Sequence, residues 1–239
     1  MTYETLSIKD RISGNPYVGR GIVIGKSEDG KKAVFAYFIM GRSENSRNRV
    51  FVENGEEVTI YPYDPSKVED PSLIIYSPIK KVNSDIIVTN GDQTDTIYQG
   101  LKEGKSFDVA LESREFEPDH PNLTPRISGI LNFKNNDFNY NMSILKSADA
   151  EGSACNRYFY EYESLNGIGH FIHTYVTDGN PLPTFMGEPE RVSIPNDIDE
   201  FASSIWNNLD SNNKIALHVR YIDIKSNEIE SVTYNVHEV

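Results

Sequence analysis

Three arginines lie close together in a strongly acidic chain. The segment GRSENSRNR, residues 41–49, contains Arg42, Arg47 and Arg49, although the protein has a formal net charge of −13. Neighbouring guanidinium groups repel one another, and each can form paired hydrogen bonds to a carboxylate or a phosphate. The arginines therefore either pair with carboxylates of the protein, as surface arginines commonly do, or bind an anionic ligand.

A second segment offers a place for an anion or a sugar. In VTNGDQTDTI, residues 88–97, a predicted strand reaches an Asn-Gly pair, and small polar residues then begin a predicted helix. Gly91 lets the backbone approach a ligand, and the free N–H groups at the helix start, with the hydroxyls of Thr94 and Thr96, suit an anion. The alternative is a plain turn in which Asp95 or Thr94 caps the helix.

Two single residues add to these segments. Arg126, in HPNLTPRISG (residues 120–129), supplies a fourth cation just before a predicted strand. Tyr76 ends the apolar run of PSLIIYSPIK (residues 71–80), where it either points into a cleft or packs in the core. Each signal is weak alone, and the segments gain weight only together.

For the cysteine and two of the histidines, the sequence favours structural roles over catalytic ones. The only cysteine, Cys155, has no histidine close to it in the sequence, so a structural thiol is favoured over a nucleophile. His170 and His173 lie on an alternating strand pattern, GHFIHTYV, where hydrogen-bonded structural histidines are expected, although either could serve a site.

The composition is that of a folded globular protein, with 38% hydrophobic and 25% charged residues. A pI near 4.8 argues against proteins that bind long nucleic acids or anionic membrane surfaces, because both require broad positive patches. The N-terminal stretch is polar and lacks the apolar core of a signal peptide, and no apolar run is long enough to span a membrane. We expect a cytoplasmic protein without nucleic-acid or membrane partners.

The elements that must position these residues follow from apolar periodicity. Residues 19–40 predict a β-hairpin that turns at Asp29-Gly30, with a first strand apolar on both faces, as in a sheet covered on both sides. Residues 41–49 are predicted as a loop. A strand that ends near the Asn-Gly pair precedes two helical stretches, the second over residues 106–116.

The second half of the chain continues the strand-turn-strand pattern. Strands are predicted over ISGILNF and FNYNMSIL, at residues 158–162 and 170–176, and in the C-terminal runs KIALHVRYIDI and SVTYNVHEV. Residues 195–210 are the clearest amphipathic helix, with Asn196 or Asp197 as its cap. The pattern indicates an α+β domain with much antiparallel sheet and a few covering helices.

Five stretches of the chain carry a resemblance to a known family: YVGRGIVIG, GRSENSRNR, PSLIIYSPI, NGDQTDTI and NLTPRI. In their order and spacing, from Tyr17 to about Gly129, they resemble the archaeal-type IMP cyclohydrolases, a family with bacterial relatives. The resemblance implies a four-layer α-β-β-α sandwich similar to that of N-terminal-nucleophile hydrolases. It also implies a reaction, the dehydrative closure of 5-formamidoimidazole-4-carboxamide ribotide to inosine monophosphate (IMP) in purine biosynthesis.

The resemblance also implies roles for individual residues. Arg49 matches an arginine of the substrate pocket, Tyr76 a tyrosine near the reacting groups, and Glu117 an acidic residue suited to proton transfer, for which Asp119 is a near alternative. Because the substrate supplies both the nucleophilic nitrogen and the electrophilic carbon, no cofactor or metal is expected. Together with Arg42 and Gly91, the further substrate-binding candidates are Arg20, Arg47, Asn90, Asp95, Thr96 and Arg126.

The chain departs from the family pattern at both ends. Residues 1–16 form an N-terminal extension, and residues 150–239 form a divergent part of what we expect to be one domain, residues 1–239. A true N-terminal nucleophile would be a Ser, Thr or Cys at the start of the first core strand. That strand begins here with YVGR, and Thr2 lies outside the predicted core, so such a nucleophile is not expected.

Two other functions fit the same residues. One is a different reaction on a related phosphoribosyl substrate. The other is a purine-nucleotide or ribotide-binding protein of the same fold with altered or lost catalysis. A homo-oligomer is expected as well, because edge strands of such sandwiches pair with one another.

Overall fold

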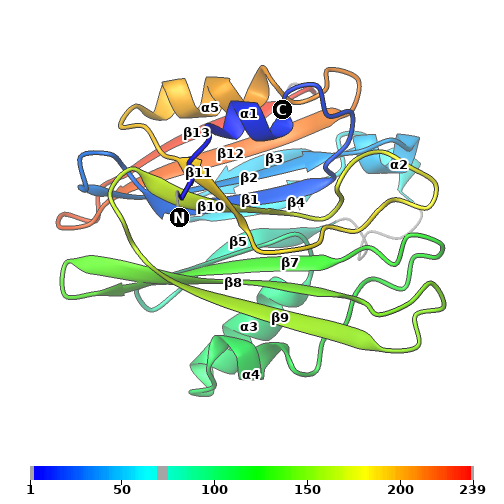
Figure 1. Cartoon of the computed structure of the whole chain (residues 1–239), viewed down its shortest axis with the longest axis horizontal. Coiled ribbons are helices and arrows are strands. Elements are labelled where there is room, and N and C mark those ends of the chain that lie inside the picture. Colours follow the sequence, from blue (N-terminus) through cyan, green and yellow to red (C-terminus); the bar gives the residue numbers. More distant parts are fainter. Residues whose placement is uncertain (1–2, 69–74, 238–239) are drawn as a thin grey trace.

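Two antiparallel β-sheets face one another in the computed structural model (Figure 1), which describes residues 3–68 and 75–237. Residues 71–74 of the predicted segment before Tyr76, and Thr2, lie outside the described residues. Helices lie on the outer faces of both sheets, which confirms the predicted α+β class. Within the described ranges, no helix is long and apolar enough to cross a membrane.

The first sheet has six strands in the order β11-β10-β1-β2-β12-β13, and the second has seven in chain order from β3 to β9. The strands of the first sheet are β1 (Arg20–Lys26), β2 (Lys32–Met40), β10 (Ile168–His173), β11 (Glu190–Ser193), β12 (Lys214–Asp223) and β13 (Ile229–Asn235). Those of the second are β3 (Val50–Asn54), β4 (Glu57–Tyr61), β5 (Tyr76–Val82), β6 (Asp85–Thr89), β7 (Arg126–Lys134), β8 (Asp137–Ser147) and β9 (Cys155–Glu163).

Strands β1 and β2 are buried on both faces. Their inward side chains, among them Ile22, Ile24 and Phe35, join residues of the second sheet in the core between the sheets. Their outward side chains join a second core beneath α1 (Ile8–Ile12) and α5 (Ile198–Trp206). The predicted hairpin and the burial of its first strand on both sides are therefore confirmed.

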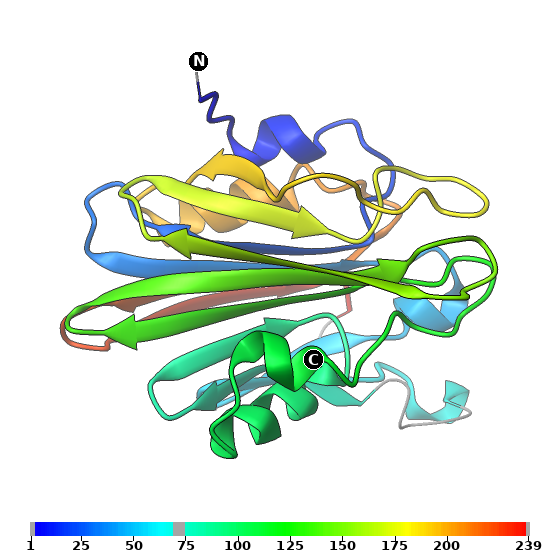
Figure 2. The ribbon, with the colours of Figure 1, turned by 60° about the horizontal axis from the view of Figure 1, so that its bottom comes forward.

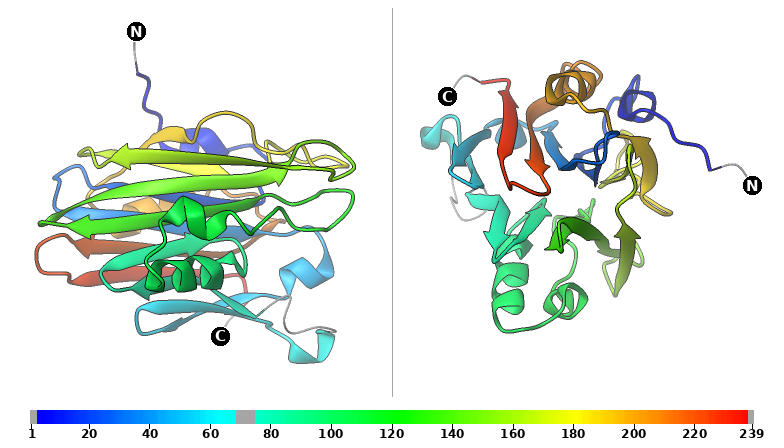
Figure 3. Two further views of the ribbon diagram at one scale, coloured as in Figure 1. Left: turned by 90° about the horizontal axis from the view of Figure 1, so that it is seen from below. Right: turned by 90° about the vertical axis from the view of Figure 1, so that its left-hand side faces the viewer.

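Three of the helices follow sequence signals. The helix α5 begins after Asp197, whose side chain accepts a hydrogen bond from the N–H of Glu200, and it confirms the predicted amphipathic helix. The helix α3 (Gln93–Lys102) confirms the helix after the Asn-Gly pair, whereas α4 (Phe107–Leu111) is shorter than predicted. Together α3 and α4 pack on the outer face of the second sheet (Figure 3).

Some short elements correct the sequence analysis. The segment 41–49 is not entirely a loop, because it contains the single turn of α2 (Glu44–Arg47). The Ser43 side chain caps this turn by accepting a hydrogen bond from the N–H of Ser46. Neither α1 nor β3 was predicted, and one 3-10 turn, η1 (Pro65–Lys67), follows β4.

The pairing registers bring the candidate segments to one end of each sheet. Strand β1 begins where β2 and β10 end, because Arg20 pairs with Ile39 and Gly21 pairs with His173. In the second sheet, β5 and β7 begin where β6 ends, at Thr89. Figure 2 shows α2 and the loop after β10 at the same end of the molecule.

Ile24 is expected to hold the two sheets together. Its side chain is fully buried, and its Cδ1 fills the space over Gly129 of β7, where an added Cβ would lie only 2.4 Å away. The substitution Ile24→Ala should lower the free energy of unfolding by about 2–5 kcal/mol, because it leaves a cavity between the sheets.

Denaturant unfolding measures this effect, with the exposed Val109 of α4 as the control position. Val109→Ala should change the free energy of unfolding by less than about 0.5 kcal/mol. An Ile24→Ala loss no larger than that of Val109→Ala would contradict the proposed packing.

Candidate active site

Two arginines from different sheets come close together. Arg20 is the first residue of β1, and Arg49 directly precedes β3; both side chains are half-buried. Among the described residues, no hydrogen-bond or ion-pair partner is found for either guanidinium group, and the Nε of Arg49 is buried without a partner. Such a pair of cations favours an anion between or beside them.

The electrostatic surroundings of the two arginines differ. Burial, followed by the neighbouring Arg20, lowers the pKa of Arg49. Burial also lowers the pKa of Arg20, but the hydroxyls of Tyr17, Tyr37 and Tyr76 together with the Glu117 carboxyl raise it by more. Because a guanidinium remains protonated in proteins, the two charges persist and repel each other.

Two tyrosines lie beside this arginine pair, one from each sheet. The Tyr76 hydroxyl donates to the backbone carbonyl of Asn90 at 2.8 Å and lies 3.5 Å from the Tyr37 hydroxyl. Burial raises the pKa of Tyr76 by more than Arg49 and Arg20 lower it, and burial raises the pKa of Tyr37 as well. Both are therefore neutral phenols at neutral pH.

Asn90 organises the backbone around the site through hydrogen bonds of both its amide nitrogen and its amide oxygen. Its Nδ2 donates to the Pro125 carbonyl at 2.9 Å, and its Oδ1 accepts from the Ile127 N–H and from Gln93 Nε2, each at 2.9 Å. This amide thus joins the end of β6 to the start of β7. Next to it, Gly91 permits the close approach of two side chains, because an added Cβ would lie only 2.6 Å from Arg126 Nη1 and from Gln93 Oε1.

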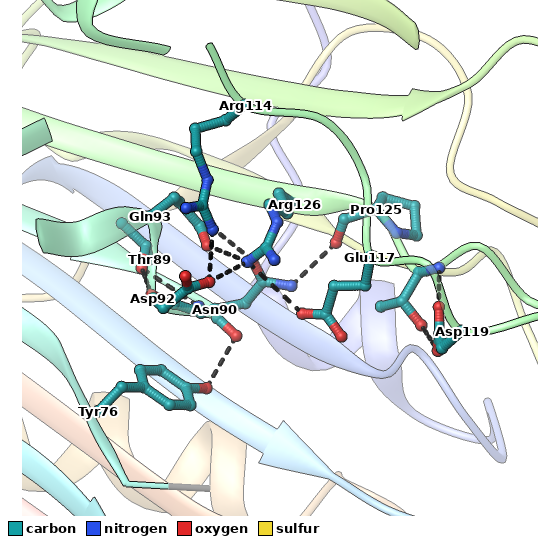
Figure 4. A network of polar contacts seen from close by, with 12 residues as sticks. Tyr76, Thr89, Asn90, Asp92, Gln93, Arg114, Glu117, Asp119, Pro125 and Arg126 are labelled. Carbon is teal, nitrogen blue, oxygen red and sulfur yellow. Dashed lines mark hydrogen bonds and ion pairs between the residues drawn. The ribbon is translucent and has the colours of Figure 1, made fainter. Parts of the chain in front are cut away.

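Arg126 is held by neighbours that were not predicted (Figure 4). Its Nη1 lies 2.7 Å from Asp92 Oδ1 and 2.8 Å from Gln93 Oε1, and Arg114 Nη2 lies 2.6 Å from the same Asp92 oxygen. Burial raises the pKa of Asp92, but its two arginine partners lower it by more, so this carboxyl stays ionised. Asp92, Gln93, Arg114 and Tyr37 gave no signal in the sequence, because only the fold brings them to this point.

Glu117 is the carboxyl that faces the cations. Its Oε1 lies 3.9 Å from Arg126 Nη1, and no hydrogen bond to its carboxyl group is found among the described residues. Burial raises the pKa of Glu117, and the nearby Asp119 adds to this, while Arg126, Arg20 and Arg49 act in the opposite direction. A carboxyl whose pKa is raised is a better proton donor at a given pH than an exposed carboxylate, and once ionised it is a stronger base.

Asp119, the alternative to Glu117, is engaged within its own loop. Its Oδ1 accepts from the Thr124 N–H at 2.6 Å, and its Oδ2 accepts from the Thr124 hydroxyl at 2.5 Å. Figure 4 shows the Glu117 carboxyl directed toward Arg126 and Asp119 on the other side of the loop. The geometry therefore favours Glu117 as the exchangeable carboxyl of the two.

Four candidates make their contacts elsewhere. Arg42 forms an ion pair with Asp178 at 2.5 Å and lies over the Tyr17 ring, which places it at the rim. The remaining three are Arg47, which donates to Asn213 Oδ1 at 3.2 Å, Asp95, which pairs with Lys80 at 2.6 Å, and Thr96, which is half-buried on α3.

The histidines and the cysteine also lie in structural contacts. His170 Nδ1 is 2.7 Å from the Tyr140 hydroxyl, and burial, with Arg191, lowers the pKa of His170 to about 4. His173 Nδ1 donates to the Tyr175 carbonyl at 2.7 Å. Cys155 lies on β9, where burial raises the pKa of its thiol. Within the described parts of the chain, no group of three or more His, Cys, Asp or Glu side chains is placed to hold a metal ion.

Comparison with known proteins gives one consistent family. The family model described as "IMP cyclohydrolase-like protein" matches residues 17–227. IMP cyclohydrolase of Methanococcus aeolicus is 34% identical over 120 residues, which cover 48% of this chain and 58% of the relative. The enzyme of that name from Methanopyrus kandleri is 36% identical over 115 residues (47% and 57%), and the one from Methanocaldococcus jannaschii is 35% identical over 117 residues (48% and 56%). The chain thus spans a little more than half the length of the curated relatives it matches.

The raised pKa of Glu117 predicts a pH-dependent effect on stability. A carboxyl whose pKa is higher in the folded than in the unfolded protein stabilises the fold below its ordinary pKa of 4.5, and this stabilisation is lost as the pH rises through the folded value. Glutamine is neutral throughout. Glu117→Gln should therefore raise the free energy of unfolding near pH 8 and have a smaller effect near about pH 4.

Chemical denaturation at the two pH values measures this difference. Asp119→Asn is the matched control and should destabilise near pH 8, because it weakens two hydrogen bonds from Thr124. Equal destabilisation by Glu117→Gln at both pH values would contradict the raised pKa of the Glu117 carboxyl.

Proposed function

This chain belongs to the IMP cyclohydrolase-like family, and from that premise we propose that it closes 5-formamidoimidazole-4-carboxamide ribotide to IMP with loss of water. The observation that carries the proposal is the pair of half-buried arginines, Arg20 and Arg49, for which no ion-pair partner is found within residues 3–68 and 75–237, beside Tyr76 and Glu117. The substrate is a phosphate monoester, so it brings the negative charge that this arrangement lacks.

The reaction requires positioning and proton transfer more than an external reagent. The carboxamide nitrogen of the substrate attacks the formyl carbon of the same molecule, a C–N bond forms, and the formyl oxygen becomes a hydroxyl group. That hydroxyl then leaves as water when the ring nitrogen loses its proton. Holding the two groups in contact accounts for much of the rate, since effective molarities of oriented intramolecular reactions are about 10⁵–10⁸ M.

We assign the arginine pair to negative charge on the ligand. A guanidinium can bind the phosphate, or it can stabilise the charge that develops on the formyl oxygen during attack. Arg49 is our choice for this second role, because its Nε is buried and it lies beside Tyr76 and Tyr37. The neutral Tyr76 phenol, fixed by its bond to the Asn90 carbonyl, borders the reacting groups.

We assign proton transfer to Glu117. As a carboxylate it can accept the proton from the amide nitrogen, and as a carboxylic acid it can return a proton to the departing hydroxyl. Its raised pKa suits both steps. Arg126, fixed by Asp92 and Gln93, faces the carboxylate form across 3.9 Å.

The remaining substrate-binding candidates divide by position. We propose that Gly91 lets Arg126 and Gln93 pack closely against the backbone and that Asn90 supports the backbone through the hydrogen bonds of its amide. Arg42, Arg47, Asp95 and Thr96 stay predictions as ligand contacts. A homo-oligomer and a cytoplasmic location also stay predictions.

We further propose a fold like that of N-terminal-nucleophile hydrolases, without their nucleophile. Two facing antiparallel sheets with helices outside them support this likeness. Arg20 stands at the start of β1, and no Ser, Thr or Cys lies in the YVGR run that leads into that strand. A single domain is supported by the N-terminal segment, where α1 contacts α5 and Leu6 pairs with Val192.

The first test is conversion of the ribotide to IMP by the purified protein, followed by absorbance and chromatography. Arg49→Ala should lower kcat/KM by about 30- to 1,000-fold, which corresponds to about 2–4 kcal/mol of lost transition-state stabilisation. Arg191→Ala is the matched control, because Arg191 also has a buried Nε without a partner but lies on β11 near His170.

Arg191→Ala should change kcat/KM by less than about threefold. Equal losses in the two variants would contradict the assignment of Arg49. A wild-type protein that binds IMP without forming it would instead favour the nucleotide-binding alternative.

If Glu117 transfers the proton, replacing it should slow turnover but leave the affinity for IMP almost unchanged. Glu117→Gln should lower kcat by about 10²–10⁴-fold, because the amide can neither accept nor donate the transferred proton. Its Kd for IMP, measured by calorimetry, should stay within about threefold of the wild-type value. Wild-type turnover in this variant would refute the role of Glu117.

A further inference from the structure

A loop from the second half of the chain joins the arginine segment to the loop that carries Glu117. We name residues 174–185, which follow β10, the bridging loop. Arg42 Nη1 lies 2.5 Å from Asp178 Oδ1 and 2.8 Å from the Gly179 carbonyl of this loop. The N–H of Leu182 donates to Asn122 Oδ1 at 3.1 Å, so the bridging loop is bonded to both neighbouring segments.

Tyr175 of the bridging loop is part of a directed hydrogen-bond chain. Its hydroxyl lies 2.6 Å from the Thr124 hydroxyl, which lies 2.5 Å from Asp119 Oδ2. An ionised carboxylate only accepts hydrogen bonds, so Thr124 donates to Asp119 and its oxygen must accept from Tyr175. The direction of each proton in this chain is therefore fixed.

This series of hydrogen bonds is connected to Glu117 through the backbone of Thr124. The Thr124 carbonyl accepts a hydrogen bond from the Glu117 N–H at 2.9 Å, while the Thr124 N–H and hydroxyl hold Asp119. Thr124 thus closes the loop between the two acidic residues. Anything that fixes Thr124 also fixes the backbone from which the Glu117 side chain extends.

Tyr175 is itself held firmly in place. It is 2% exposed, and its ring stacks on Tyr17 with centroids 5.9 Å apart. Gly19, with φ +77°, passes so close that an added Cβ would lie 2.6 Å from Tyr175 Cδ2. The close packing around Tyr175 thus fixes the position of its hydroxyl beside Thr124.

We infer that Tyr175 is a positioning residue that, through Thr124, fixes Glu117 in its half-buried place before the arginine pair. The inference rests on the proposed function, since it gives Glu117 the proton-transfer role. It assigns a catalytic purpose to the bridging loop, which supplies none of the groups placed next to the substrate.

The groups that face Glu117 determine how its pKa should respond. They are Arg126 from β7, Arg20 from β1, Arg49 before β3, Tyr76 from β5, and Asp119 from its own loop. Burial is the largest contribution, and it raises the pKa. Loosening the loop admits water to the carboxyl, so the pKa of Glu117 should fall when Tyr175 loses its hydroxyl.

The test compares Tyr175→Phe, Thr124→Val and the double variant with the full-length wild-type protein. The first measurement is the titration of the Glu117 carboxyl by carbon-13 NMR of labelled glutamate, assigned with Glu117→Gln. The second is the pH dependence of kcat and KM for ring closure. Tyr140→Phe is the control, because Tyr140 is 1% exposed and its hydroxyl bonds to His170 on another strand.

Tyr175→Phe should move the Glu117 titration, and the matching limb of the kcat/KM profile, to lower pH. It should lower kcat by about ten- to a hundredfold with KM within about threefold, since a misplacement of about 1 Å can cost about 10² in rate. Tyr140→Phe should leave the titration unchanged. Because both hydroxyls act through one chain, the double variant should be no slower than Thr124→Val alone.

An unchanged Glu117 titration in Tyr175→Phe, or additive effects in the double variant, would overturn the inference. If Tyr175→Phe fails to fold, the titration in Thr124→Val decides in the same way. The NMR measurement needs no substrate. Absent ring closure by the wild type would therefore refute the proposed function separately, while the titration still reports on Tyr175.

Discussion

The repulsion between Arg20 and Arg49 is the constraint on which the site depends. Two half-buried cations that repel each other, with no ion pair to either in the part of the chain that the structure describes, destabilise the folded protein, and the cost must be offset elsewhere. The apolar core between the sheets provides the offset, since β1 and β2 are buried on both faces next to the site. With a net charge of −13 over the whole chain, the surrounding acidic surface limits how far the attraction of these two arginines for anions extends.

The carboxylates around the arginines have different tasks because their surroundings differ. Asp92 lies between Arg114 and Arg126 and stays ionised, so it fixes Arg126 instead of exchanging protons. Both carboxylate oxygens of Asp119 accept hydrogen bonds from Thr124. Glu117 alone of these three is left without a hydrogen bond to its carboxyl within the described residues, and burial raises its pKa. Environment, more than residue type, thus separates structural carboxylates from a reactive one.

The two halves of the chain contribute in different ways. The segments that we propose to contact the substrate all come from residues 20–126. The second half supplies β10 to β13, the helix α5 and the bridging loop, which hold those segments in position. The family match over residues 17–227 is consistent with this division, because it includes both the reactive segments and their support.

The sequence by itself determined the local elements and the family. The β1–β2 hairpin, α3 and α5 arise from apolar periodicity, an Asp-Gly turn and a capping aspartate, which act over a few residues. Only the tertiary structure shows which of the clustered arginines lies beside Arg20. Arg47 on α2 faces solvent, whereas Arg49, two residues later, meets Arg20 at the start of β3. It also distinguishes the surroundings of Glu117 and Asp119, because the hydrogen bonds of Thr124 to Asp119 depend on a loop folded against Tyr175, far away in the chain.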